Sequence, residues 1–161
     1  MQWAKQERLR GRKRLMPKIC RTMWKAEDDS PTVGTDSHML GARITGKQTD
    51  ISPDSDGNVH PDTGGISVAR SINDLLPHLI PKRLRDHFED AAGSNSRFVW
   101  SMGAGEFSEG IVADDLLLRL KPKNAPGKVQ GLVEPTSMMM LQEYQSALAA
   151  TRPRWTIDEP K

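Results

Sequence analysis

The residues best suited to chemistry lie together in the first half of the chain. Gly64-Gly65 supplies two positions without a Cβ, where backbone N–H groups can approach a ligand closely. Ser67 alternates with the apolar Ile66 and Val68, as on a β-strand, so its hydroxyl points away from their side. A glycine turn that leads into a strand with such a hydroxyl could hold a phosphate or a sugar. A hairpin loop without a ligand is the alternative interpretation, because short glycine motifs are weak signals.

The residues around this turn predict its local fold. Asp56-Gly57 is a turn dipeptide, and Pro61 fixes the backbone shortly before the glycines. We expect a short strand near Val59, a tight Gly-Gly turn, and a second strand over residues 66–68.

Two blocks of the chain resemble one known family. The first is a turn at Asp56-Gly57 followed by His60-Pro61-Asp62-Thr63-Gly64-Gly65-Ile66-Ser67-Val68. The second is residues 131–139, followed by a helical segment and Trp155. Their order and spacing resemble the Tse2-like toxins, small bacterial and fungal proteins with an ADP-ribosyltransferase-like fold, named for a toxin delivered by the type VI secretion system. The resemblance covers roughly residues 39–155.

The resemblance implies NAD as a substrate, gripped by its phosphates and its nicotinamide ribose. A carboxylate beside that ribose would stabilise the oxocarbenium-like transition state. On this basis Glu134 and Ser67 are the candidate catalytic residues, and Arg43 is the candidate phosphate-binding fork. The other candidate cofactor-binding residues are Gly64, Gly65, Thr63 and His60. Gln130 lies four residues before Glu134, so the Gln/Glu-x-Glu signature of this transferase pattern is absent.

Structural roles are an alternative for each polar candidate. Arg43 could form a surface ion pair with Asp50 or Asp54, and Ser67 could satisfy backbone groups at a strand end. Glu134 precedes a proline and could complement the dipole of the following helix.

The histidines give no sign of a metal site. His60 before Pro61 could face a ligand, or it could be an exposed loop histidine. The four histidines of the chain show no metal-ligand spacing, so no metal is expected.

Composition favours a modest globular domain in a reducing compartment. The chain has 161 residues, 36% of them hydrophobic, and a mean hydropathy of −0.60. Its single cysteine, Cys20, excludes an internal disulfide. No apolar run approaches a membrane span, and the start of the chain lacks the apolar core of a secretory signal. We therefore expect a cytoplasmic protein without membrane contact, and leave open export without a signal peptide.

The net charge of +2 conceals an uneven distribution. Residues 1–25 contain nine basic residues and one acidic residue, whereas the rest of the chain holds 14 basic and 20 acidic residues, a net charge of −6. Such a basic segment could contact nucleic acid or an acidic partner. A solvated arm without a specific partner is the favoured alternative.

The pattern predicts a tail followed by one domain. We expect residues 1–36 to be a basic N-terminal tail and linker, partly disordered, with some helix over residues 2–26. Residues 37–158 would form the ADP-ribosyltransferase-like toxin domain. Expected strands lie at 39–45, near 59, and at 66–68, 97–102, 111–112, 116–120 and 129–134; short helices lie at 71–80, 82–90 and 138–150. Trp100, Leu118 and Leu148 are expected in the core.

These elements predict an α+β fold, since strands and helices do not alternate regularly. The family resemblance adds a compact, mixed, split β-sheet with short helices. The expected function is a toxin-like domain that binds NAD and could transfer ADP-ribose to a macromolecular target; whether it is an enzyme stays open. The alternative is a non-catalytic binding module of a toxin–antitoxin or effector–immunity pair, with a cognate immunity or antitoxin protein as partner.

Overall fold

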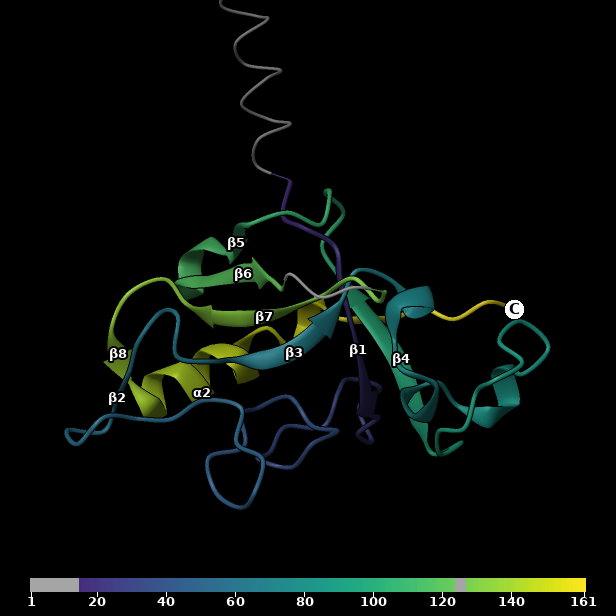
Figure 1. The fold of residues 1–161 in the computed structure, drawn as a ribbon, viewed down its shortest axis with the longest axis horizontal. Helices are drawn as coiled ribbons and strands as arrows, with labels where there is room; N and C mark the ends of the chain where they lie inside the picture. The colour runs from purple at the N-terminus through teal and green to yellow at the C-terminus, as the bar shows by residue number, and fades with distance from the viewer. Residues whose placement is uncertain (1–14, 124–126) are drawn as a thin grey trace, which may run out of the picture.

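The computed structural model describes residues 15–123 and 127–161, and these form an α+β fold built on one curled antiparallel sheet (Figure 1). The strand order is β5-β6-β7-β3-β1-β4-β9. The bounds are β1 Ile19–Trp24, β3 Ile66–Ala69, β4 Arg97–Met102, β5 Gly110–Ala113, β6 Leu118–Pro122, β7 Gln130–Pro135 and β9 Thr156–Ile157. A second, two-stranded sheet pairs β2 (Asn58–Val59) with β8 (Met139–Met140).

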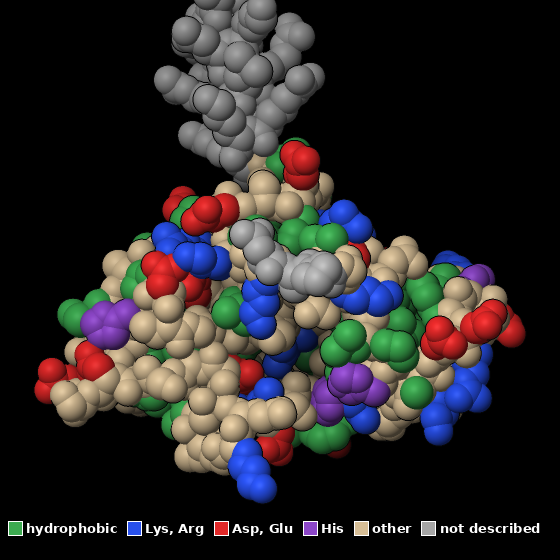
Figure 2. Space-filling view, viewed as in Figure 1, with side chains coloured by type: hydrophobic (Ala, Val, Ile, Leu, Met, Phe, Trp, Pro, Cys, Tyr) green, Lys and Arg blue, Asp and Glu red, His purple; other side chains and the backbone are tan. Residues whose placement is uncertain are grey.

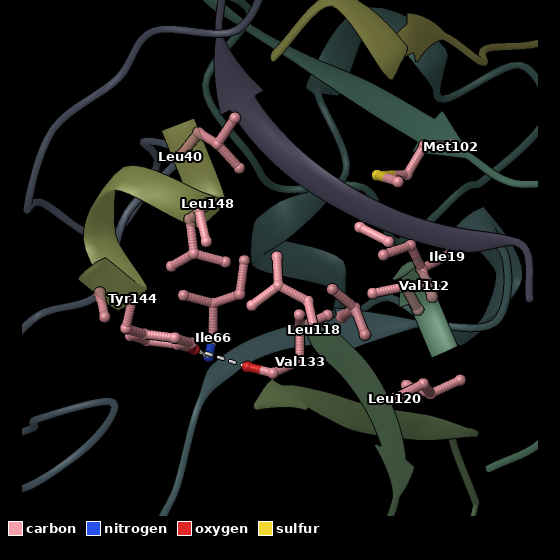
Figure 3. Close-up of a cluster of buried hydrophobic side chains, with 14 of the residues drawn as sticks. Ile19, Leu40, Ile66, Met102, Val112, Leu118, Leu120, Val133, Tyr144 and Leu148 are labelled. Carbon is pink, nitrogen blue, oxygen red and sulfur yellow. Dashed lines mark hydrogen bonds between the residues drawn. The ribbon is translucent and has the colours of Figure 1, made fainter. Parts of the chain in front are cut away.

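One face of the sheet carries the main core. Alternate residues of the strands, among them Ile19, Ile66 and Val133, pack against the helix α2 (Leu141–Ala150) and the chain that follows it (Figure 3). Tyr144 and Leu148 of α2 are buried, and Trp155 folds back onto the same cluster. The expected core positions Trp100, Leu118 and Leu148 are all confirmed, with at most 1% of each side chain exposed.

The opposite face is covered by short 3-10 turns between β3 and β4. These are η1 (Ile72–Asp74), η2 (Pro77–Leu79) and η3 (Lys82–Leu84); two further turns, η4 (Asp114–Leu116) and η5 (Arg152–Arg154), lie elsewhere. Leu75, Ile80 and Leu84 pack there on Val99 and Ala69 of the sheet. Prolines at 77 and 81 keep this segment from forming a longer helix.

The prediction that residues 1–36 form a tail is wrong for the part that the structure describes, residues 15–36. Residues 19–24, expected to be partly helical, form β1, which lies between β3 and β4 in the sheet and whose first five residues are buried. Ile19 and Met23 pack in the main core, and β1 pairs with β4 along its whole length. The domain therefore begins well before residue 37. Residues 1–14 lie outside the described residues.

Three local expectations are also corrected. Residues 39–45 form no named strand: Leu40 makes an isolated bridge with Val33, and beyond it the backbone is held by a side chain of α2 and by Asp50. β2 and β3 do not pair as a hairpin, since β2 pairs with β8. That pairing uses Met139 and Met140, so α2 begins at Leu141 and not at the expected Met138.

The sheet divides between β1 and β3. The two strands share one paired position, Cys20 with Ala69, and then diverge. The turn η2 and residues 37–50 border the gap. This gap, the β1–β3 fork, positions the candidate site.

In the described ranges, no helix is long and apolar enough to cross a membrane.

Candidate functional site

A pocket of about 340 Å³ occupies the β1–β3 fork. One wall is polar and carries Arg21, Arg43, Asp50 and Ser67. The apolar part of the lining is formed by the leucines at 75, 76 and 79. The face of the molecule seen in Figure 2 is hollowed in its middle, and blue basic side chains lie at the floor of this hollow. A pocket with one cationic and one apolar wall suits a ligand with an anionic group and a flat or apolar part.

Arg21 is the most deeply placed charge of this pocket, with 7% of the residue exposed. Its Nη1 donates to Ser67 O at 2.7 Å, and its Nη2 donates to Ser37 O and Met39 O at 3.3 and 3.2 Å. It forms no ion pair with any described residue, and its buried Nε has no hydrogen-bond partner. Burial lowers the pKa of Arg21, because desolvation penalises the charged form. The guanidinium is thus a buried cation that only neutral carbonyls solvate.

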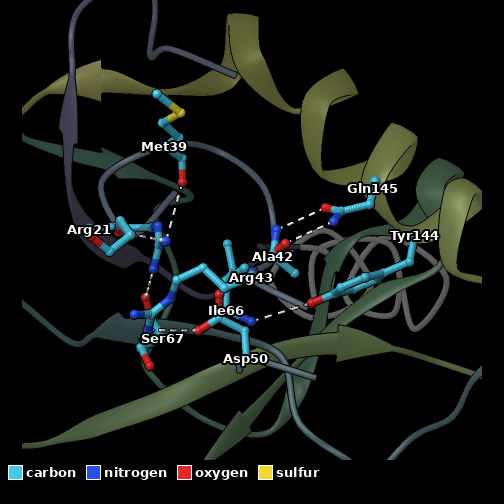
Figure 4. Close-up of polar contacts among 10 residues, drawn as sticks. Arg21, Met39, Ala42, Arg43, Asp50, Ile66, Ser67, Tyr144 and Gln145 are labelled. Carbon is cyan, nitrogen blue, oxygen red and sulfur yellow. Dashed lines mark hydrogen bonds and ion pairs between the residues drawn. The ribbon is translucent and has the colours of Figure 1, made fainter. Parts of the chain in front are cut away.

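Arg43 enters the pocket from the loop that faces Arg21. Its Nη2 lies 3.2 Å from Asp50 Oδ1, and its backbone N donates to Asp50 Oδ2 at 2.7 Å. Gln145 of α2 fixes the loop by two 2.8 Å hydrogen bonds to the backbone N–H and C=O of Ala42 (Figure 4). The ion pair with Asp50 that the sequence suggested as an alternative is therefore present, and Arg43 Nε still lacks a partner.

Ser67 lies beside both arginines (Figure 4). Its neighbours Ile66 and Val68 are buried in the main core, so the exposed Ser67 side chain lies on the other face of β3. Its carbonyl accepts from Arg21. With Arg21 and Arg43 at +1 each and Asp50 at −1, the polar wall keeps one uncompensated positive charge.

His38 lines the pocket as a neutral group. Burial, together with the nearby charge of Arg97, lowers the pKa of His38 to about 4. Its Nε2 lies 2.5 Å from Arg97 Nη1. At neutral pH the imidazole therefore accepts a hydrogen bond and adds no charge to the fork.

Glu134, the expected catalytic acid, does not line this pocket. Only 1% of the residue is exposed, because β6 and the 60–64 segment enclose it. Its Oε1 accepts from Arg119 Nε at 2.7 Å and lies 2.7 Å from Arg119 Nη2 in an ion pair, and its Oε2 accepts from the backbone N–H of Asp62 at 2.8 Å. In this structure the carboxylate is a structural ion-pair partner.

The two glycines serve packing more directly than ligand approach. Gly64 has φ +128°, and a Cβ there would lie 2.3 Å from Asp50 O. A Cβ on Gly65 would lie 2.2 Å from Val133 O of β7. Both positions need glycine because neighbouring backbone occupies the space of a side chain. Neither glycine lines the pocket.

Thr63 and His60 lie on the surface segment away from the fork. The Thr63 hydroxyl donates to His60 O, and His60 Nε2 lies 2.6 Å from Asp54 Oδ2. The structure thus brings together Arg43 and Ser67 of the candidate residues, and it separates His60, Thr63, Gly64, Gly65 and Glu134 from their pocket.

Arg21 is the residue that the sequence analysis missed. Its signal was present: Ile19, Arg21 and Met23 recur with a period of two, which places an arginine among core positions of a strand. The abundance of basic residues around it favoured a solvated segment instead.

Neither protein-family models nor curated proteins identify a relative of this chain: no family model matches it, and a search of curated proteins returns no significant match.

Proposed function

We propose that this chain is a toxin-like domain with an ADP-ribosyltransferase-like fold that binds NAD in the β1–β3 fork. The observation that carries the proposal is the buried guanidinium of Arg21, which lines the pocket and has no carboxylate partner among the described residues. A buried charge is costly unless it is paired, so an anionic ligand would relieve that cost. The pyrophosphate of NAD is such an anion.

The remaining walls fit the other parts of a dinucleotide. Arg43 presents a planar fork to phosphate oxygens, and the Ser67 hydroxyl can bond a ribose. The leucines at 75, 76 and 79 offer an apolar surface to a base or to nicotinamide. The pocket volume of about 340 Å³ falls within the usual range for small-molecule sites.

Transfer of ADP-ribose would need a carboxylate at the reacting ribose. Glu134 lies on the same face of the sheet as Ser67, because Ser67 pairs with Leu132 and Glu134 follows two residues along β7. Binding is the function that the present geometry supports best, and transfer follows if Glu134 becomes accessible. The alternative, a binding module of a toxin–antitoxin or effector–immunity pair, would bind without turnover.

Calorimetric titration of NAD into the full chain tests the proposal. Arg43→Gln and Ser67→Ala should weaken binding, the former about 10- to 100-fold, because a charge-assisted hydrogen bond to phosphate is lost. Arg154→Gln is the matched control, since Arg154 pairs with Asp115 outside the pocket. Release of nicotinamide, measured on the same samples, separates the transferase from the binding module. Absence of NAD binding by the unaltered chain would refute the proposal.

A further inference from the structure

The segment that covers Glu134 is held without any buried side chain of its own. Val59 and Ile66, at its two ends, are fully buried. Between them, residues 60–64 are all exposed or half-buried. No apolar side chain therefore anchors residues 60–64, and the hydrophobic cost of moving them is small.

Side-chain contacts hold this segment at one residue, Asp62, while a backbone bridge of Gly64 with Ile51 fixes its C-terminal end. The backbone N–H of Asp62 donates to Glu134 Oε2, and its carboxylate pairs with Lys121 and lies 3.9 Å from Arg119 Nη2. The side chain of Asp62 is 59% exposed and that of Lys121 44%, so salt screens their attraction. The remaining contacts of Thr63 and His60 lie within the surface segment itself.

The closed segment has an uncommon backbone conformation. Asp62 has φ +66°, in the left-handed region that few residues other than glycine, asparagine and aspartate adopt. Gly64 follows with φ +128°, a conformation that glycine adopts without steric cost, and its bridge with Ile51 marks the point where a moving segment would end. Release of the Asp62 contacts would let the backbone leave this conformation.

Opening would uncover a carboxylate on the site's own face of the sheet. Glu134 is the diagonal cross-strand neighbour of Ser67, and such neighbours lie roughly 7–8 Å apart. Arg119, directly opposite Glu134 on β6, would remain as its partner.

We propose that residues 60–64 form a lid over Glu134, latched by Lys121 and Glu134 at Asp62, and that its opening joins Glu134 to the β1–β3 fork. The lid is a regulatory device of the site and rests on the proposed function for its purpose. Its motion depends only on the chain itself.

Two measurements on the full chain test the lid without NAD. Hydrogen exchange reports opening through the amides of residues 60–65, with β4 as the internal reference. Carbodiimide coupling to glycine ethyl ester, followed by mass spectrometry, reports the accessibility of the Glu134 carboxylate. Lys121→Met removes the latch while keeping the apolar stem of the side chain. Lys123→Met, at an exposed position two residues further along the chain, is the control.

Lys121→Met should speed exchange at residues 60–65 about two- to five-fold, the size expected from one exposed ion pair, and labelling of Glu134 should rise with it. β4 and the Lys123→Met variant should match the unaltered chain. Unchanged exchange, or faster exchange with Glu134 still protected, would overturn the lid. An equal rise in β4 would also overturn it, since the opening would then be global. Failure of NAD to bind would count against the proposed function and leave these results standing.

Discussion

Two arginines on strands of the same sheet differ in their partners, since one pairs with a carboxylate and the other donates only to carbonyl groups among the described residues. Arg119 on β6 donates a 2.7 Å hydrogen bond from Nε to the carboxylate of Glu134, and its Nη2 forms an ion pair with the same oxygen at 2.7 Å. Arg21 on β1 is more buried, yet it donates only to the carbonyls of Ser67, Ser37 and Met39. The β6–β7 region is thus electrostatically complete, whereas the fork keeps a cation without a counter-charge. The difference indicates that charge at β6–β7 serves the fold and that charge in the fork is available to a ligand.

The largest effect is expected from removal of β1, which forms one side of the β1–β3 fork. A chain that begins at residue 36 lacks β1, which pairs with β4 at six positions and buries Ile19 and Met23. It should lose the cooperative unfolding transition in a urea titration monitored by circular dichroism. A chain that begins at Leu15 keeps β1 and should retain that transition. Normal folding of the shorter chain would show that β1 is dispensable.

Glu134→Gln tests the β6–β7 region, where Arg119 has a carboxylate as its counter-charge. The substitution preserves shape but removes the charge that compensates Arg119 and accepts from Asp62. We expect the free energy of unfolding to fall by about 2–3 kcal/mol, since a nearly buried ion pair loses one partner. Urea denaturation measures the loss, with Glu109→Gln as an exposed control. A loss no larger than that of the control would contradict a structural role for Glu134.

Arg43→Gln tests the β1–β3 fork, where one positive charge is left uncompensated. The Arg43–Asp50 pair is partly exposed on the arginine side, and Asp50 keeps its hydrogen bond from the backbone of residue 43. The free energy of unfolding should therefore change by less than about 1 kcal/mol. The same urea titration compares this variant with Glu134→Gln. An equal loss for the two variants would remove the contrast between the regions.

A further expected effect, confined to acidic pH, is a dependence of stability on pH through His38. Its pKa in the folded chain is lowered to about 4, from an ordinary value of 6.5, so the folded state disfavours the proton. This contribution to stability is fully present above pH 6.5 and is lost as the pH falls from 6.5 towards 4. The melting temperature should therefore drop less over this window in His38→Gln than in the unaltered chain. Identical pH profiles would place His38 outside the charged environment of the fork.

The sequence predicted the parts of the fold whose signals are local. The β-branched and aromatic run of β4, the alternation in β3 and the apolar face of α2 all form as expected, with the core residues Trp100, Leu118 and Leu148. β1 was missed because Pro17 and the flanking basic residues favour exposure. Its burial depends on β3 and β4, which lie more than 40 residues away in the chain.

The site was predicted only in part for the same reason. Arg43 and Ser67 carry local signals, and they do share the pocket. The enclosure of Glu134 depends on Arg119, 15 residues earlier, and on a backbone amide 72 residues earlier. Pairings at such separations are set by strand register, which local patterns do not specify.

The most direct test of the central claim observes the arginines themselves. In a proton–nitrogen correlation spectrum of the full chain, the Nε–H groups of Arg21, Arg43 and Arg119 can be followed during titration with NAD. The Nε–H resonances of Arg21 and Arg43, whose Nε atoms have no partner among the described residues, should shift saturably with NAD. The Nε–H resonance of Arg119, whose Nε donates to Glu134, should stay in place. Absence of a shift at Arg21 and Arg43, or an equal shift at all three, would contradict the assignment of the fork as the ligand site.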